Sequence, residues 1–198
     1  MLLTEPVQIT QRLVREFEDL NIQYYIGGSL ASSLHGIPRA TQDVDIIADI
    51  ALQHIPKLIK VLEAEFYIDG DMIKDAIQRR KSFNLIHYET MFKVDIFIPK
   101  SDLAAQEEME RRQQYQVSDS PQQLLYLASA EDIILNKLQW FQMGGGVSER
   151  QWNDVLGVIQ IQHTNLDRTY LERAAQQRGI SDLLQKVFKK FETNELSD

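Results

Sequence analysis

The spacing of apolar residues predicts a chain in which helices and strands alternate at first and only helices follow. Apolar positions recur every three or four residues over 4–20, 51–66 and 72–80, which is typical of one buried helix face. Short apolar runs indicate strands at 22–28, 43–49, 82–89, 92–99 and 124–129, and further helices are predicted at 29–36 and 102–113. After residue 130 the pattern is helical throughout, over 130–142, 148–162, 167–177 and 180–193.

This order of elements predicts an α+β fold. We expect a mixed sheet flanked by helices in residues 1–128 and a helical subdomain, packed on that core, in residues 129–198. The runs 82–89 and 92–99 are so close in sequence that they predict an antiparallel hairpin. Gly36 is expected to end the helix before it, since glycine is common just after a helix. Ser129 and Asp132 have the spacing of a helix-capping box.

Three aspartates lie on two of the predicted strands. Asp43 and Asp45 are two residues apart, so both side chains point to the same face of their strand. Asp95 lies between Val94 and Ile96 in the later strand. Carboxylates this close repel each other unless a cation lies between them, and hard oxygen ligands suit Mg²⁺. The simpler alternative is that the first two acids face water at a strand end and Asp95 lies on an exposed edge strand.

Gly27-Gly28-Ser29 follows an apolar strand and precedes a helix. Glycines allow a close approach of the backbone to phosphate, and the free N–H groups at a helix N-terminus favour anions. The Ser29 hydroxyl would donate to the same phosphate. The alternative is a structural turn that requires a positive φ.

Together these segments resemble the polymerase-β-like nucleotidyltransferase superfamily. Its pattern is a Gly-Gly or Gly-Ser turn, a spacer, an Asp-apolar-Asp pair and a third carboxylate on a later strand; "IGGS", "DVDI" and "KVDIFIP" match these parts in order. The spacer of residues 30–42 is at the long end of the family range. The resemblance implies that the Gly27–Ser29 turn holds a nucleoside triphosphate and that Asp43, Asp45 and Asp95 bind two Mg²⁺ ions. Asp95 would also help to deprotonate the attacking hydroxyl.

The helical half is similar to the corresponding region of AbiE-type toxin nucleotidyltransferases and related bacterial proteins. That resemblance implies a phosphate contact from Lys137 and nucleotide-binding roles for Arg150 and Asp154, and Arg39 has a length and position suited to reach phosphate as well. The alternatives are a solvated lysine, a loop charge at Arg39, and an ordinary i, i+4 ion pair between Arg150 and Asp154.

Composition limits the partners. The chain of 198 residues carries a net charge of −8, so constitutive binding of duplex nucleic acid is not expected. There is no cysteine, no signal-peptide pattern and no apolar run long enough to cross a membrane, which predicts a cytoplasmic protein. The four histidines lack metal-ligand spacing, and Trp140, Phe141 and Trp152 have the spacing of core residues between helices rather than of a base-stacking surface.

The predicted function is therefore Mg²⁺-dependent transfer of a nucleoside monophosphate from an NTP to a hydroxyl acceptor, which is RNA, a protein or a small molecule. A tRNA-modifying toxin is one special case, although no basic patch for tRNA is evident in the sequence. The alternative is a catalytically degenerate nucleotide-binding or antitoxin-like interaction protein. The order of the three carboxylates favours the enzyme.

Overall fold

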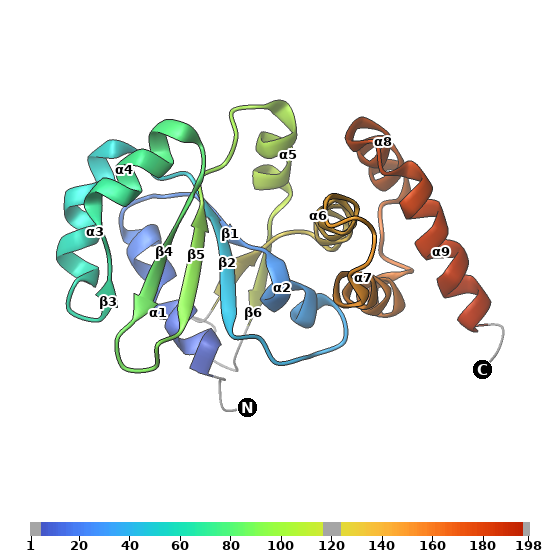
Figure 1. Cartoon of the computed structure of the whole chain (residues 1–198), viewed down its shortest axis with the longest axis horizontal. Coiled ribbons are helices and arrows are strands. Elements are labelled where there is room, and N and C mark those ends of the chain that lie inside the picture. Colours follow the sequence, from blue (N-terminus) through green and yellow to red (C-terminus); the bar gives the residue numbers. More distant parts are fainter. Residues whose placement is uncertain (1–4, 117–123, 196–198) are drawn as a thin grey trace. The chain divides into compact units, whose positions relative to one another are not determined.

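The computed structural model describes residues 5–116 and 124–195, which form two compact units. The first unit contains residues up to 30 and 40–128, and the second contains residues 31–39 and 129 onwards. The chain therefore leaves the first unit within helix α2 (Gly28–His35) and returns to it before strand β2 (Asp43–Ala48). Figure 1 shows the strands in the first unit and the helices α6 to α9 in the second.

The first unit is built on a mixed sheet. Within the described residues it has seven strands in the order β3-β4-β5-β2-β1-β7-β6. Strand β2 pairs in parallel with β5 and antiparallel with β1, while β1 also pairs in parallel with β7. The bounds of the other strands are Tyr24–Ile26 (β1), Phe66–Tyr67 (β3), Ser82–His87 (β4), Lys93–Phe97 (β5), Gln113–Gln116 (β6) and Leu124–Leu127 (β7).

The predicted hairpin is confirmed, because β4 and β5 pair antiparallel. The alternation of buried and half-buried residues along β5 also follows the sequence pattern, with Val94 and Ile96 fully buried. Helix α1 (Glu5–Asp19) packs on β2, and α4 (Gly70–Arg79) packs on β4. The prediction placed the start of the first helix at residue 4, which lies outside the described residues.

The prediction of one helix over 51–66 is wrong. A 3₁₀ turn η1 (Leu52–His54) leads into a short helix α3 (Ile55–Leu62), and Phe66 then joins the sheet in β3. Pro56 lies in the first turn of α3, where proline is tolerated, and Phe66 is completely buried in the sheet. The helical spacing of apolar residues extends beyond α3 because α3 and β3 both bury apolar side chains. The sequence pattern therefore suggests one longer helix.

The helical pattern predicted after residue 130 is confirmed in the second unit. This unit contains α6 (Ala130–Met143), α7 (Glu149–Gln162), α8 (Arg168–Arg178) and α9 (Ser181–Glu195), while the first unit also contains α5 (Leu103–Arg111). Ser129 caps α6 by accepting a hydrogen bond from the Asp132 backbone N–H at 3.1 Å. Asp132 is buried, and its carboxylate accepts hydrogen bonds from the Ser129 and Tyr170 hydroxyls.

Gly36 follows the end of α2 as expected, because the helix stops at His35 and the Gly36 backbone N–H donates to the Ser32 carbonyl oxygen at 2.9 Å. It does not adopt a positive φ after α2; instead it lies directly against the backbone of α7. A Cβ atom at this position would be 2.7 Å from the backbone carbon of Gly157. The requirement for glycine at residue 36 is thus a close approach of two backbone segments.

Candidate functional site

The three predicted carboxylates come from two neighbouring strands of the first unit. Strands β2 and β5 run parallel, and their register places Asp45 directly beside Asp95 and Asp43 directly beside Lys93. Residues that are two apart in a strand share a face, so Asp43, Asp45 and Asp95 lie on one face of the sheet. All three are half-buried, whereas Val44 between them is fully buried on the opposite face. The structure therefore brings together the three acids that the sequence pattern singled out.

The glycine turn reaches the same place. The Gly27 backbone N–H donates a hydrogen bond to the Asp45 carbonyl oxygen at 2.9 Å. Gly28 begins α2 with a φ of +55°, and a Cβ atom there would lie 1.8 Å from Asp45 Oδ2. Residue 28 is therefore glycine for two reasons, its left-handed backbone and its contact with a carboxylate. Ser29 follows in the first turn of α2 and is buried.

Thr41 is a residue of this region that the sequence pattern did not single out. Its hydroxyl donates to the Asp43 carboxylate at 3.0 Å and lies 2.9 Å from the Asp43 carbonyl oxygen. A threonine hydroxyl that bonds to a backbone group two residues further on is a common local pattern. The hydrogen bond to the Asp43 carboxylate fixes it at the start of β2.

Lys93 supplies the positive charge in this group. Its ammonium nitrogen lies 2.7 Å from Asp95 Oδ2. The hydrogen bond to Asp95, with smaller contributions from the charges of Asp43 and Asp45, raises the pKa of Lys93 above its ordinary value. The lysine is thus held in the field of all three carboxylates.

The donor set suits Mg²⁺ in its chemistry, since three carboxylates on one face offer hard oxygen ligands. Within residues 5–116 and 124–195, no three acidic or histidine side chains are arranged as a finished metal ligand set. At Asp95 the ammonium of Lys93 lies next to Oδ2. A cation that binds between the three acids therefore competes with this lysine.

The other predicted nucleotide-binding residues form a second cluster, which lies in the helical unit. Arg39 donates two hydrogen bonds to Asp154, at 2.7 Å from Nε and 2.9 Å from Nη2. Lys137, on α6, donates to Asp154 Oδ2 at 2.7 Å and to Gln151 Oε1 at 3.2 Å. The side chains of Lys137 and Asp154 are only 6% and 8% exposed.

Burial and neighbouring charges shift the pKa values of both Lys137 and Asp154. Burial lowers the pKa of Lys137 more than its contact with Asp154 raises it, and the charges of Arg39 and Arg150 lower it further. Burial would raise the pKa of Asp154, but the hydrogen bonds from Arg39 and Lys137 outweigh burial and lower it. The Asp154 carboxylate thus pairs with both Arg39 and Lys137, and the charge of Arg150 lies near Lys137.

These contacts correct three alternatives from the sequence. Lys137 is buried rather than a solvated helix residue, and Arg39 is not an isolated loop charge. The ion pairs of Asp154 in the described structure join it to Arg39 and Lys137, on other segments, rather than only to its helical neighbour Arg150. The aromatic prediction is wrong for Trp140, which is 58% exposed, whereas Phe141 is buried against Trp152.

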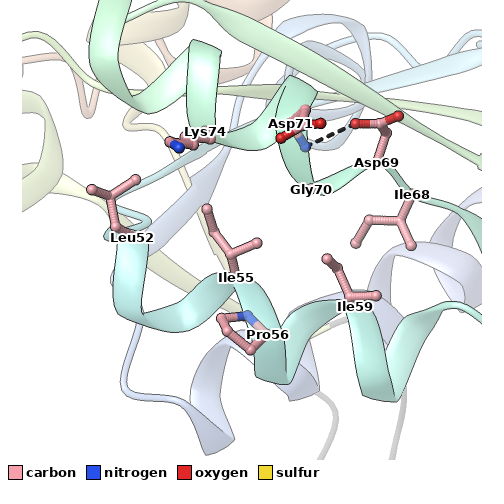
Figure 2. Close-up of a pocket in the computed structure, with 9 residues that line it drawn as sticks. All are labelled: Leu52, Ile55, Pro56, Ile59, Ile68, Asp69, Gly70, Asp71 and Lys74. Atoms are coloured by element: carbon pink, nitrogen blue, oxygen red, sulfur yellow. Dashed lines mark hydrogen bonds between the residues drawn. The ribbon is translucent and has the colours of Figure 1, made fainter.

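A separate pocket of about 670 Å³ lies in the first unit between η1–α3 and the start of α4. Figure 2 shows the side chains of Leu52, Ile55 and Ile59 along one wall and Lys74 on the other. Asp69 caps α4 by accepting a hydrogen bond from the Asp71 backbone N–H at 2.8 Å. None of the predicted site residues lines this pocket.

Comparison with known proteins identifies the fold. The chain is similar to the solution structure of the antibiotic-resistance factor ANT(2'')-Ia, with a TM-score of 0.55 and 11% identity over 100% of both chains. It is also similar to the lincosamide antibiotic adenylyltransferase LnuA in its lincomycin-bound form, with a TM-score of 0.52 and 17% identity over 80% of this chain and 98% of LnuA.

The third likeness is to an antigenic nucleotidyltransferase-like protein from Paracoccidioides brasiliensis, with a TM-score of 0.55 and 17% identity over 94% of each chain. The fold is the nucleotidyltransferase fold. The predicted fold class is thus confirmed, with a mixed sheet and helices in the arrangement of these proteins.

No protein-family model and no curated protein matches the sequence. None of the helices in the described part of the chain combines the length and apolar character needed to span a bilayer.

Proposed function

We propose that this chain is a nucleotidyltransferase that moves a nucleoside monophosphate from an NTP to a hydroxyl acceptor. The observation that carries the proposal is the register of β2 and β5, which places Asp45 beside Asp95 with Asp43 on the same face. The contact of Gly28 with Asp45 adds a turn suited to phosphate at the same position. Both features occur in a chain with the nucleotidyltransferase fold.

The proposed reaction is an in-line displacement at the α-phosphorus of the NTP. The acceptor oxygen forms a bond to this phosphorus while the bond to the bridging oxygen of the β-phosphate breaks, and pyrophosphate leaves. Asp95 accepts the proton of the attacking hydroxyl. The backbone N–H groups at the start of α2, near Gly28 and Ser29, bind the triphosphate, since the first N–H groups of a helix have no partner within it.

Two Mg²⁺ ions held by Asp43, Asp45 and Asp95 would neutralise the phosphate oxygens and the leaving group. Three neighbouring residues determine whether these carboxylates are free to bind the ions. Thr41 orients the Asp43 carboxylate, Gly28 leaves room for that of Asp45, and Lys93 must release Asp95.

The cluster of Arg39, Lys137 and Asp154, with the charge of Arg150, is proposed to bind a phosphate group. The cationic side chains of Arg39, Lys137 and Arg150 suit an anion, and Asp154 fixes the positions of Arg39 and Lys137. This role agrees with the resemblance of the helical half to AbiE-type toxin nucleotidyltransferases, and we propose that the chain is similar to them in function.

The acceptor is proposed to be RNA, a protein or a small molecule with a free hydroxyl group. ANT(2'')-Ia has been solved with adenylyl-2''-tobramycin, and LnuA with lincomycin, so proteins of this fold act on small antibiotics. The fold hosts several acceptors, and the acceptor must be found by experiment.

A second candidate is a nucleotide-binding or antitoxin-like protein without transfer activity. The contact of Lys93 with Asp95 favours it, because this lysine already neutralises the carboxylate that would accept the proton. The two candidates differ in turnover rather than in binding.

Calorimetry with each NTP and Mg²⁺ tests the binding step. We expect the wild type to bind an NTP and the Asp43→Asn, Asp45→Asn double variant to lose Mg²⁺-dependent binding while it keeps the wild-type melting temperature. Asp19→Asn, Glu63→Gln is the matched control, since both acids are exposed and the net charge changes by the same amount. Equal binding by the wild type and the double variant would exclude the carboxylates as the metal site.

Turnover is tested with α-labelled NTPs and cell extract, followed by size separation of labelled products. Label in RNA, protein or a small molecule identifies the acceptor class. NTP binding with neither label transfer nor pyrophosphate release favours the second candidate.

A further inference from the structure

The helical unit contains a pocket of about 950 Å³ that has no part in the proposed transfer chemistry. Its aromatic side is formed by Phe141 and Trp152, whose ring centroids are 5.3 Å apart at an angle of 44°. Lys186, Lys189 and Lys190 of α9 also line it. The ammonium of Lys186 lies 5.6 Å from the centroid of the Trp152 ring.

The charge of this pocket contrasts with that of the whole chain. The net charge of the chain is −8, yet three lysines and one carboxylate, Glu149, line the pocket. The three lysines are exposed, and among the described residues neither Lys189 nor Lys190 takes part in an ion pair. The lining of the pocket is therefore basic, although the chain as a whole is acidic.

The aromatic and basic groups are close enough to bind one ligand together. Trp152 is half-buried, so part of its ring is accessible, and Phe141 supports the ring from the core. Lys186 and Lys190 are four residues apart, which places their stems on one face of α9, separated by about 6 Å along the axis. A ligand that fits has a flat ring and more than one anionic group.

We propose that this pocket binds a segment of single-stranded nucleic acid. A base would stack against Trp152, and successive phosphates would contact the lysines of α9, which is the usual combination in proteins that bind single strands. The ammonium of Lys186 lies over the Trp152 ring, so a base that stacks there takes its place and leaves the ammonium next to the phosphate of that nucleotide. Several lysines along one helix favour a strand over a single nucleotide. The inference does not depend on nucleotidyl transfer.

Fluorescence anisotropy with a labelled single-stranded RNA of about 12 nucleotides tests the proposal, at low salt and without NTP or Mg²⁺. We expect binding by the wild type and at least tenfold weaker binding by the Lys189→Glu, Lys190→Glu variant. The log–log slope of affinity against salt should become shallower by about 0.7 for each phosphate that the variant no longer neutralises. Lys57→Glu, Lys60→Glu is the matched control, because these exposed lysines lie on α3 and the net charge changes by the same amount.

Stacking is tested by the fluorescence of Trp152 in a Trp140→Phe background, which removes the other tryptophan of the chain. The RNA should quench this fluorescence, whereas polyphosphate, which has no bases, should not. Asp45→Asn should bind the RNA as the wild type does, which separates this result from failure of the transfer reaction. Any of three results overturns the proposal: no RNA binding, an equal loss in the α3 control, or a mononucleotide that binds as tightly as the strand.

Discussion

Gly28 and Asp45 are in direct contact, because a Cβ atom on residue 28 would lie 1.8 Å from Asp45 Oδ2 and 2.7 Å from its carboxyl carbon. The first turn of α2 therefore lies so close to the β2 carboxylate that no side chain fits at residue 28 without moving Asp45. The backbone at Gly28 also has a φ of +55°, which side chains rarely tolerate. The glycine turn and the carboxylate face, which are 17 positions apart in sequence, thus form one structural feature.

Gly28→Ala should displace the Asp45 carboxylate and weaken Mg²⁺-dependent NTP binding by at least tenfold. The new methyl group occupies the position of the carboxylate oxygen, so Asp45 must change its rotamer. The measurement is calorimetry with the NTP that the wild type binds. Thermal unfolding should show a loss of about 1–2 kcal/mol, from the left-handed backbone and the displaced side chain.

Gly179→Ala is the control for backbone strain alone. Gly179 has a φ of +67° at the end of α8, and a Cβ atom there would meet nothing within 4 Å. We expect a similar strain cost with unchanged NTP binding. If Gly28→Ala binds NTP as the wild type does, the close contact has no role in ligand binding.

Lys93→Met should strengthen the binding of Mg²⁺ alone, in the absence of NTP. The variant removes the ammonium 2.7 Å from Asp95 Oδ2 and leaves three carboxylates without their cation. A unit charge at this distance is worth about 1 kcal/mol even in bulk water, so the affinity for Mg²⁺ should rise about fivefold or more. Without Mg²⁺ the melting temperature should fall, and added Mg²⁺ should restore it.

Lys60→Met is the matched control, since Lys60 is exposed on α3 and its loss changes the net charge equally. It should change neither Mg²⁺ affinity nor the melting temperature. Weaker Mg²⁺ binding by Lys93→Met would show that the lysine supports the cation site rather than competing for it.

The sequence was sufficient to predict the parts of the structure that depend on local pattern. Two-residue alternation placed Asp43 and Asp45 on one strand face, and the apolar neighbours of Asp95 placed it in a strand. The parallel pairing of β2 with β5 could not be read from the sequence, because the two strands are about 50 positions apart. The register that puts Asp45 beside Asp95 therefore came only from the structure.

The missed elements have a common physical cause. Strand β3 is two residues long, and strand β6, Gln113–Gln116, is polar, so neither has a strand pattern of its own. Both are strands only because a neighbouring strand supplies hydrogen-bond partners. The pairing of Arg39 with Asp154 could not be predicted from local sequence either, since 115 positions separate the two residues.

The cluster around Asp154 makes a prediction about stability and pH. Asp154→Asn leaves Lys137 and the bidentate contact of Arg39 without a carboxylate, and both lie in a largely buried setting. Removal of one partner from a buried ion pair costs about 3 kcal/mol or more. Lys137→Met is the matched comparison, because it removes a buried charge while Arg39 still pairs with Asp154, and we expect a much smaller loss.

The pH dependence follows from the lowered pKa of Asp154. The folded-state pKa lies below the ordinary value of 3.8, so the unfolded chain binds this proton first as the pH falls. The stability from this carboxylate is complete above pH 3.8 and is lost as the pH falls through the lower folded-state pKa. Chemical denaturation of the wild type and Asp154→Asn, from about pH 6 to about pH 3, should therefore show a difference in unfolding free energy that is constant above about pH 3.8 and shrinks below it. A difference that stays constant over this range would contradict the role of Asp154 as the shared anion of Arg39 and Lys137.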